Sequence, residues 1–150
     1  NNRWQDPNAP DPTNELSWQS NSSTLILATE AQDKNGNIIF SDPLDYITEK
    51  NNNIYFVQNG TLYKRVLAAP DPNNSAVTTC PAATSSSSCP PDAVLVHNVA
   101  SFSVQYYDAA NASVPPSDAR SIGITLQLAT TEYGHTIHAS YTTRMVFRND

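Results

Sequence analysis

The sequence predicts a mainly β protein built from antiparallel sheets. Apolar and polar residues alternate along the last third of the chain, and no long segment has the period of an amphipathic helix. The pair Asn59-Gly60 stands between two strand-like segments and is typical of a two-residue hairpin turn. A chain of 150 residues is long enough to form one domain with its own core.

The first elements in chain order are a lead-in and two short strands. Residues 1–15 contain three prolines and few apolar side chains, so we expect a linker there. Residues 16–150 are expected to form a single β-rich domain. Within it, Leu16–Trp18 and Thr24–Thr29 predict two strands, and the second is apolar enough to be buried on both faces.

A turn is predicted at Asp33–Asn37, where the spacing Asp-x-Asn-x-Asn resembles that of a calcium loop. An EF-hand loop requires glycine at its sixth position and glutamate at its twelfth. Here glycine stands fourth and Leu44 stands twelfth. A hairpin turn is the favoured interpretation, and calcium binding is the alternative. A short strand at 45–48 and the hairpin of Ile54–Gln58 with Thr61–Leu67 are expected next.

The segment from Ala68 to Asp92 is rich in Ala, Pro, Asn, Ser and Thr, which predicts a long exposed loop. Cys80 and Cys89 lie within it at a spacing that fits neither a redox motif nor a zinc knuckle. A local disulfide is favoured over two free thiols, and it would contribute roughly 2–3 kcal/mol and indicate an oxidising compartment. Loops of this length are often functional. We therefore select candidate interaction residues in it, namely Ala68, Pro70, Asp71, Asn73, Thr84, Ser86 and Pro90.

After a strand at Val94–Val96, three long antiparallel strands are expected, at 102–106, 121–128 and 136–148. Each should bury one face and expose the other, and Gly134 should supply the turn before the last strand. On that strand the expected apolar face holds Ile137, Ala139, Tyr141, Met145 and Phe147, and the polar face holds His138, Ser140, Thr142, Arg144 and Arg148.

Catalysis and cofactors are not expected. His135 and His138 would lie on opposite faces of a strand and could not share a metal ion. Asp71 and Asp92 could act as paired carboxylates, as could Asp6 and Asp11, but proline-rich loops would hold them poorly. The chain contains neither a nucleophile elbow nor a glycine-rich phosphate loop. The net charge of −6 argues against a nucleic-acid partner.

Outward-pointing tyrosines leave one binding function open, because sugars stack on exposed aromatic rings. Tyr55, Tyr63 and Tyr107 are the candidates. Cross-strand aromatic side chains more often stabilise the sheet itself. A secreted β-sandwich that binds carbohydrate or acts as an adhesin is therefore the alternative function.

The order of the segments resembles minor pilins and pseudopilins, in particular W-type minor pilins of type IV pili and J-type pseudopilins of type II secretion systems. Ala119-Arg120-Ser121-Ile122 opens the second-last strand, and the last strand ends at Arg148-Asn149, as in such chains. The similarity spans roughly residues 16–149 and rests on the order of short segments, which are Leu16–Trp18, Ser23–Leu27, Gly60–Arg65, Val99–Asp108, Asp118–Leu128 and Tyr141–Asn149.

The resemblance implies a structural subunit without catalytic residues. Its partners would be other minor and major pilins or pseudopilins, or a receptor on a host or cell surface. Proteins of this kind are anchored in the membrane by an apolar N-terminal helix before they assemble at the cell surface. This sequence contains no apolar run of that length, so we expect a domain that lacks the helix, with residues 1–15 leading from it.

Overall fold

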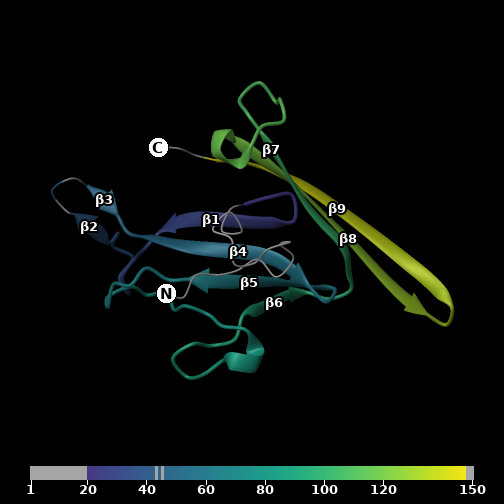
Figure 1. The fold of residues 1–150 in the computed structure, drawn as a ribbon, viewed down its shortest axis with the longest axis horizontal. Coiled ribbons are helices and arrows are strands. Elements are labelled where there is room, and N and C mark those ends of the chain that lie inside the picture. Colours follow the sequence, from purple (N-terminus) through teal and green to yellow (C-terminus); the bar gives the residue numbers. More distant parts are fainter. Residues whose placement is uncertain (1–19, 43, 45, 148–150) are drawn as a thin grey trace. The chain divides into compact units, whose positions relative to one another are not determined.

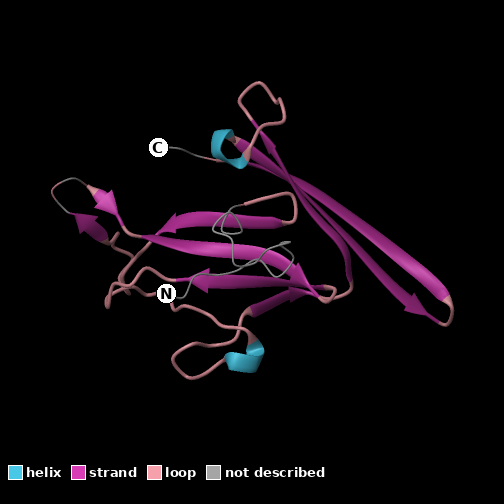
Figure 2. Ribbon diagram, in the orientation of Figure 1, coloured by secondary structure: helices cyan, strands magenta, loops and turns pink. Residues whose placement is uncertain are grey.

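The computed structural model of the chain describes residues 20–42, 44 and 46–147. Strands dominate this part, and two short 3-10 turns are its only helical elements (Figure 2). The predicted mainly β class is confirmed. Predictions for residues 1–19 and for Arg148 lie outside the described residues. In chain order the elements are β1 Thr24–Glu30, β2 Phe40–Asp42, β3 Ile47–Thr48, β4 Lys50–Gln58, β5 Thr61–Leu67, η2 Ala82–Thr84, β6 Ala93–Val96, β7 Val99–Tyr107, η3 Pro116–Asp118, β8 Ser121–Glu132 and β9 His135–Val146 (Figure 1).

The described strands form three sheets, with the orders β1-β4-β5-β6, β2-β3 and β7-β8-β9. Two-residue turns join the two long hairpins. Between β4 and β5, Asn59 and Gly60 have φ values of 51° and 70°. Between β8 and β9, Tyr133 and Gly134 have φ values of 51° and 80°. Positive φ at both central residues defines the type I′ class of turn, so both predicted turns are confirmed.

The prediction for Thr24–Thr29 is correct as a strand and wrong in its burial. Among the described strands β1 stands at the end of the order β1-β4-β5-β6, and only its residues Thr24 and Leu25 are buried. Its last three residues are exposed. An apolar run therefore does not by itself predict burial on both faces of a strand, because burial depends on tertiary packing that the local sequence does not encode.

The described residues separate into two compact units, each with buried side chains of its own. Unit 1 contains residues 20–25, 56–62 and 95–147, and unit 2 contains residues 26–42, 44, 46–55 and 63–94. The buried apolar residues of unit 1 are Leu25, Phe56, Leu62, Val99, Val104, Tyr106 and Ile122. Those of unit 2 are Ala31, Ile54 and Ala69, and the polar residue Asn51 is also buried there.

The three-stranded sheet of unit 1 has one apolar and one polar face. Residues opposite each other in an antiparallel register point to the same face, and β8 pairs with β9 without a shift from Ser121↔Val146 to Glu132↔His135. The polar face carries hydroxyl ladders, such as Thr125 with Thr142 at 3.3 Å and Thr131 with Thr136 at 3.0 Å. We call the other side the apolar face; on β8 and β9 it carries Ile122, Ile124, Leu126, Leu128, Ile137, Ala139, Tyr141, Thr143 and Met145, with the polar residues Thr130, Glu132 and His135 at the turn end.

Burial differs along the apolar face, and here one expectation is wrong. Ile122 is fully buried, whereas Ile137, Tyr141 and Met145 are 59%, 62% and 41% exposed. The predicted assignment of β9 residues to faces is confirmed by the register, but the apolar face of β9 is not buried among the described residues. The alternation of apolar and polar residues identifies the face without identifying what covers it.

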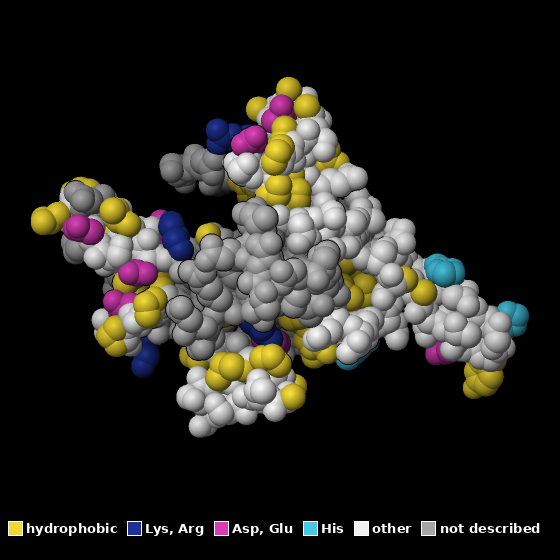
Figure 3. Space-filling view, in the orientation of Figure 1, with side chains coloured by type: hydrophobic (Ala, Val, Ile, Leu, Met, Phe, Trp, Pro, Cys, Tyr) yellow, Lys and Arg dark blue, Asp and Glu magenta, His cyan; other side chains and the backbone are white. Residues whose placement is uncertain are grey.

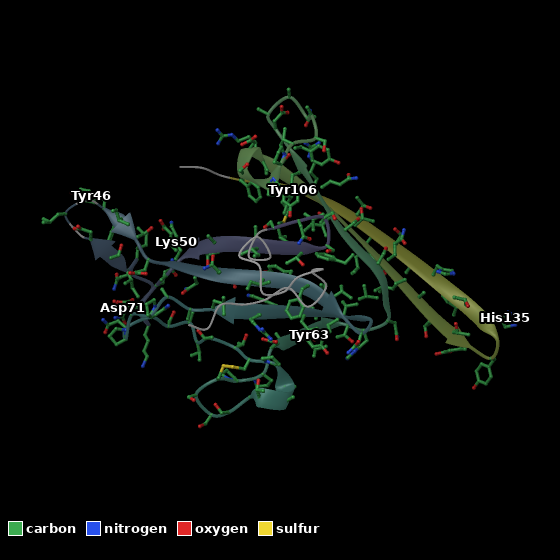
Figure 4. The ribbon with its side chains drawn as sticks, in the orientation of Figure 1. Tyr46, Lys50, Tyr63, Asp71, Tyr106 and His135 are labelled. Atoms are coloured by element: carbon green, nitrogen blue, oxygen red, sulfur yellow. A yellow bond between two sulfur atoms is a disulfide. The ribbon has the colours of Figure 1, made fainter. Side chains whose placement is uncertain are left out.

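Tyr106 links β7 to the segment before β1 within unit 1 (Figure 4). Its ring is buried, and its hydroxyl donates a hydrogen bond to the carbonyl oxygen of Asn21 at 2.9 Å. We expect Tyr106→Phe to lower the free energy of unfolding by about 1 kcal/mol, because the partly buried hydrogen bond to the carbonyl of Asn21 is lost. Urea unfolding monitored by circular dichroism measures the change.

The same residue predicts a pH dependence. Burial raises the pKa of Tyr106 above that of a free tyrosine. Above about pH 10 the unfolded chain therefore loses this proton before the folded chain does, and stability falls as pH rises. Between about pH 8 and about pH 10.5, the urea midpoint of unfolding should fall less in Tyr106→Phe than in the unchanged protein. An equal decline in both would contradict the assignment to Tyr106.

Candidate interaction surfaces

The predicted loop from Ala68 to Asp92 begins with an anchored segment. The backbone N–H of Thr79 donates to the carbonyl of Val66 at 2.9 Å, and the N–H of Val66 donates to the Thr79 hydroxyl at 2.9 Å. The N–H of Ala68 likewise donates to the hydroxyl of Thr78 at 3.0 Å. Residues 68–80 therefore return alongside the end of β5, and their backbone is partly satisfied by threonine side chains.

A buried ion pair fixes the other end of the loop. The guanidinium of Arg65 on β5 donates to both carboxylate oxygens of Asp92, and the two side chains are only 14% and 5% exposed. The hydroxyl of Thr79 donates to the same carboxylate at 2.8 Å. The expectation that a proline-rich loop holds Asp92 poorly is wrong, because a bidentate arginine contact is both strong and directional.

A second anchor lies at Asn51 on β4. Its side-chain oxygen accepts hydrogen bonds from the backbone N–H of Ala69 at 2.9 Å and from the amide of Asn74 at 2.7 Å. The N–H of Ser75 donates to the carbonyl of Gln32 at 2.8 Å. Sequence reasoning missed Asn51, Asn74 and Thr79, since asparagine and threonine are ordinary loop residues and their partners are distant in sequence.

The rest of the loop forms a lobe that we call the disulfide lobe, residues 80–92 (Figure 4). Cys80 and Cys89 are joined by a disulfide, as the sequence predicted, with Cα atoms 5.6 Å apart. The backbone N–H of Cys80 donates to Pro90 at 2.9 Å, and that of Asp92 donates back to Cys80 at 2.8 Å. The disulfide and these two hydrogen bonds fix the base of the lobe. Residues 81–88 are all exposed, so the tip of the lobe is free to contact a partner.

The seven predicted interaction residues fall on both parts of the loop. Pro70 and Asn73 are exposed in the anchored part, and Thr84 and Ser86 are exposed on the lobe; Ala68, Asp71 and Pro90 are half-buried. The carboxylate of Asp71 accepts the backbone N–H of Asn73 at 2.7 Å and so closes a local turn (Figure 4).

The second candidate surface is the exposed part of the apolar face, on the β8–β9 hairpin that ends at His135 (Figure 4). Figure 3 shows histidine side chains near the end of this hairpin. A shallow hollow of about 200 Å³ lies on it beside the turn between β6 and β7, where Leu128, Ile137 and Ala139 meet His97 and Asn98. Large contiguous apolar patches on a protein surface mark sites of protein contact, and this face is a candidate for one.

The Asp33–Asn37 segment forms a hairpin turn, the interpretation that the sequence favoured. One carboxylate oxygen of Asp33 accepts the backbone N–H groups of Asn35 and Asn37, at 2.8 and 2.9 Å. The other accepts the side-chain amide of Asn37 at 2.9 Å, and these bonds from Asn37 lower the pKa of Asp33. The carboxylate is thus directed at its own turn. Within the described residues, no group of three or more His, Cys, Asp and Glu side chains could hold a metal ion.

The ring of Tyr107, one of the three candidate sugar platforms, already has neighbours on the polar face. The guanidinium carbon of Arg144 lies 4.6 Å from the ring centroid, a cation–π arrangement. Gly123 lies beneath the ring, since a Cβ there would be 3.3 Å from it. Tyr55 and Tyr63 are half-buried. Tyr107 therefore acts as a sheet-stabilising aromatic residue in this geometry.

Searches of protein-family models, curated proteins and solved structures found no match for this chain. In the part of the chain that the structure describes, none of the helical elements is long and apolar enough to span a bilayer.

Proposed function

We propose that this chain is a structural subunit that acts by protein–protein assembly, as a minor pilin of a type IV pilus or a pseudopilin of a type II secretion system. The observation that carries the proposal is the exposed apolar face of β9. A filament subunit needs a permanent apolar contact surface, and Ile137, Tyr141 and Met145 provide one on a regular sheet.

Two further features support the proposal. The order of segments along the chain is similar to that of minor pilins and pseudopilins, as described above. The disulfide lobe presents an exposed tip on a fixed base, an arrangement suited to contacts with a neighbouring subunit or a surface receptor. The subunit would act in a tip complex, in filament initiation or in adhesion, at the cell surface and without a cofactor.

The test uses the full natural gene product in the cells that produce it. Filaments are sheared from the cell surface, purified and probed with an antibody against this chain. We expect the unchanged protein in the filament fraction, and we expect the triple variant Ile137→Ser, Tyr141→Ser, Met145→Ser to be lost from it.

A matched control changes the same number of exposed side chains on the opposite face of the same strand. The variant Thr136→Ser, His138→Ser, Thr142→Ser should still enter filaments, because the apolar face is intact. If neither the unchanged protein nor the control is found in filaments, the assembly function is wrong. Binding of the purified protein to a glycan array would then favour the carbohydrate-binding alternative.

A further inference from the structure

The outer edge of β9 is long, regular and uncovered by any strand of the described chain. β9 has twelve residues and stands at the end of the order β7-β8-β9. Its register with β8 runs without a shift from end to end. An edge of this kind presents a row of backbone donors and acceptors to any strand that approaches it.

The parity of the hydrogen bonds identifies the residues that form this row. A two-residue turn makes Glu132 and His135 a hydrogen-bonded pair, and every second pair after it has the same pattern. At the far end of the hairpin the backbone N–H of Phe147, also an odd-numbered residue, donates to the carbonyl oxygen of Arg120 at 2.9 Å. The odd-numbered residues therefore bond toward the β8 side along the whole strand. The backbone groups that point away from β8 therefore belong to the even-numbered residues, which are Thr136, His138, Ser140, Thr142, Arg144 and Val146.

The usual devices that block a sheet edge are missing from β9. The strand contains no proline, lysine or bulge, and eleven of its twelve residues are exposed. Its arginine, Arg144, is directed back at its own sheet. The guanidinium donates to the hydroxyl of Ser121 at 2.9 Å and lies over the ring of Tyr107. The positive charge of Arg144 consequently does not disfavour the approach of another strand to the outer edge of β9.

We propose that β9 pairs antiparallel with β9 of a second copy of this chain, about a two-fold axis at Tyr141. Hydrogen-bonded pairs can form only between outward-pointing residues, and the row of six is symmetric about position 141. Only one register therefore pairs all six outward-pointing residues of each strand. A shift by two residues loses one of these hydrogen-bonded pairs. The hydrogen-bonded pairs are Thr136 with Val146, His138 with Arg144, and Ser140 with Thr142, each formed twice.

The same register matches the apolar side chains with each other. The symmetric register sets Tyr141 opposite its own copy and Ile137 opposite Met145 twice, all on the apolar face. A register shifted by two residues would instead set Tyr141 opposite Ala139 or Thr143. Aromatic and aliphatic cross-strand pairs stabilise a sheet, so the side chains favour the register that the backbone requires. The self-pairing does not depend on the proposed filament function.

The test is site-specific disulfide formation with Tyr141→Cys. The two native cysteines are bonded to each other, so this variant has a single free thiol. In the proposed dimer the two Cα atoms at position 141 form a non-hydrogen-bonded pair at about 4.5 Å, which lies within the range of a disulfide. Under mild oxidation we expect a covalent species of twice the 16.4 kDa chain mass on non-reducing gels.

Thr143→Cys is the matched control, because it is also exposed on the apolar face of β9 but faces Ala139 in the partner. Its two copies would be four residues apart along the strand, about 13 Å, and should not cross-link. Ile137→Cys and Met145→Cys should each stay monomeric alone and form a dimer when mixed. Equal cross-linking of Tyr141→Cys and Thr143→Cys would overturn the register.

A second variant separates self-pairing from folding. The N–H of Thr142 points outward, so Thr142→Pro removes an edge donor and the hydroxyl contact with Thr125, but no backbone hydrogen bond to β8. Light scattering after gel filtration should show a dimer for the unchanged chain and its loss in Thr142→Pro, with an unchanged circular dichroism spectrum. If the unchanged chain is a monomer at every concentration up to its solubility limit, the proposal is wrong. Because Thr142→Pro retains the apolar face, it should still enter filaments if the proposed function is correct.

Discussion

Replacing Ile122 with alanine should lower the free energy of unfolding by about 3–4 kcal/mol. Ile122 is fully buried and stands in register between Tyr106 on β7 and Met145 on β9. Removing three carbon atoms from such a site loses the transfer free energy of the side chain and leaves a cavity, and the two losses add. Urea unfolding followed by circular dichroism, with a check that the slope is unchanged, measures the effect.

Ile137→Ala is the control for this prediction, since it removes the same atoms from the same face of the same sheet. Ile137 is 59% exposed, so we expect a change of no more than about 1 kcal/mol. If Ile137→Ala destabilised the chain as much as Ile122→Ala, the apolar face of β9 would be covered in solution. The pair of variants thus measures directly which part of this face belongs to the core and which part is available to a partner.

The strands and turns could be predicted because their signals are local. The alternation from Ile122 to Leu128 and the pairs Asn59-Gly60 and Tyr133-Gly134 act over a few residues, and the structure has strands and type I′ turns there. Burial could not be predicted in the same way. The exposure of Tyr141 and of the last three residues of β1 depends on what packs against each strand, which alternation does not encode.

The long loop shows a second limit of sequence reasoning. Its composition indicated a freely exposed segment, and the disulfide within it was predicted from two cysteines at a short spacing. The contacts that hold the loop join residues far apart in the chain, such as Arg65 with Asp92 and Asn51 with Asn74. These residues are common on protein surfaces, so only the folded backbone reveals that they lie together and partly buried.

Replacing Asp92 with alanine should destabilise the protein by about 3 kcal/mol, although Asp92 lies at the end of a loop. Its carboxylate is 5% exposed and accepts hydrogen bonds from the guanidinium of Arg65 and the hydroxyl of Thr79. Removing one member of a buried ion pair is costly, because it leaves the other charge buried without a partner that compensates for its lost hydration. Chemical unfolding in urea measures the loss.

An exposed ion pair of the same unit provides the control. Lys50 and Glu30 lie 3.3 Å apart with side chains 47% and 42% exposed, so Glu30→Ala should cost less than about 1 kcal/mol. The double variant Arg65→Met, Asp92→Leu should recover much of the loss, since apolar side chains can replace a buried pair.

The ion pair also predicts how the disulfide lobe behaves. Asp92 closes the lobe at its base, so Asp92→Ala should speed limited proteolysis within residues 80–92, while Glu30→Ala should leave that rate unchanged. Unchanged proteolysis in Asp92→Ala would mean that the disulfide alone fixes the lobe. The lobe can present its exposed tip to a partner in a defined geometry only if its base is fixed, which gives the buried charge pair a role in recognition as well as in stability.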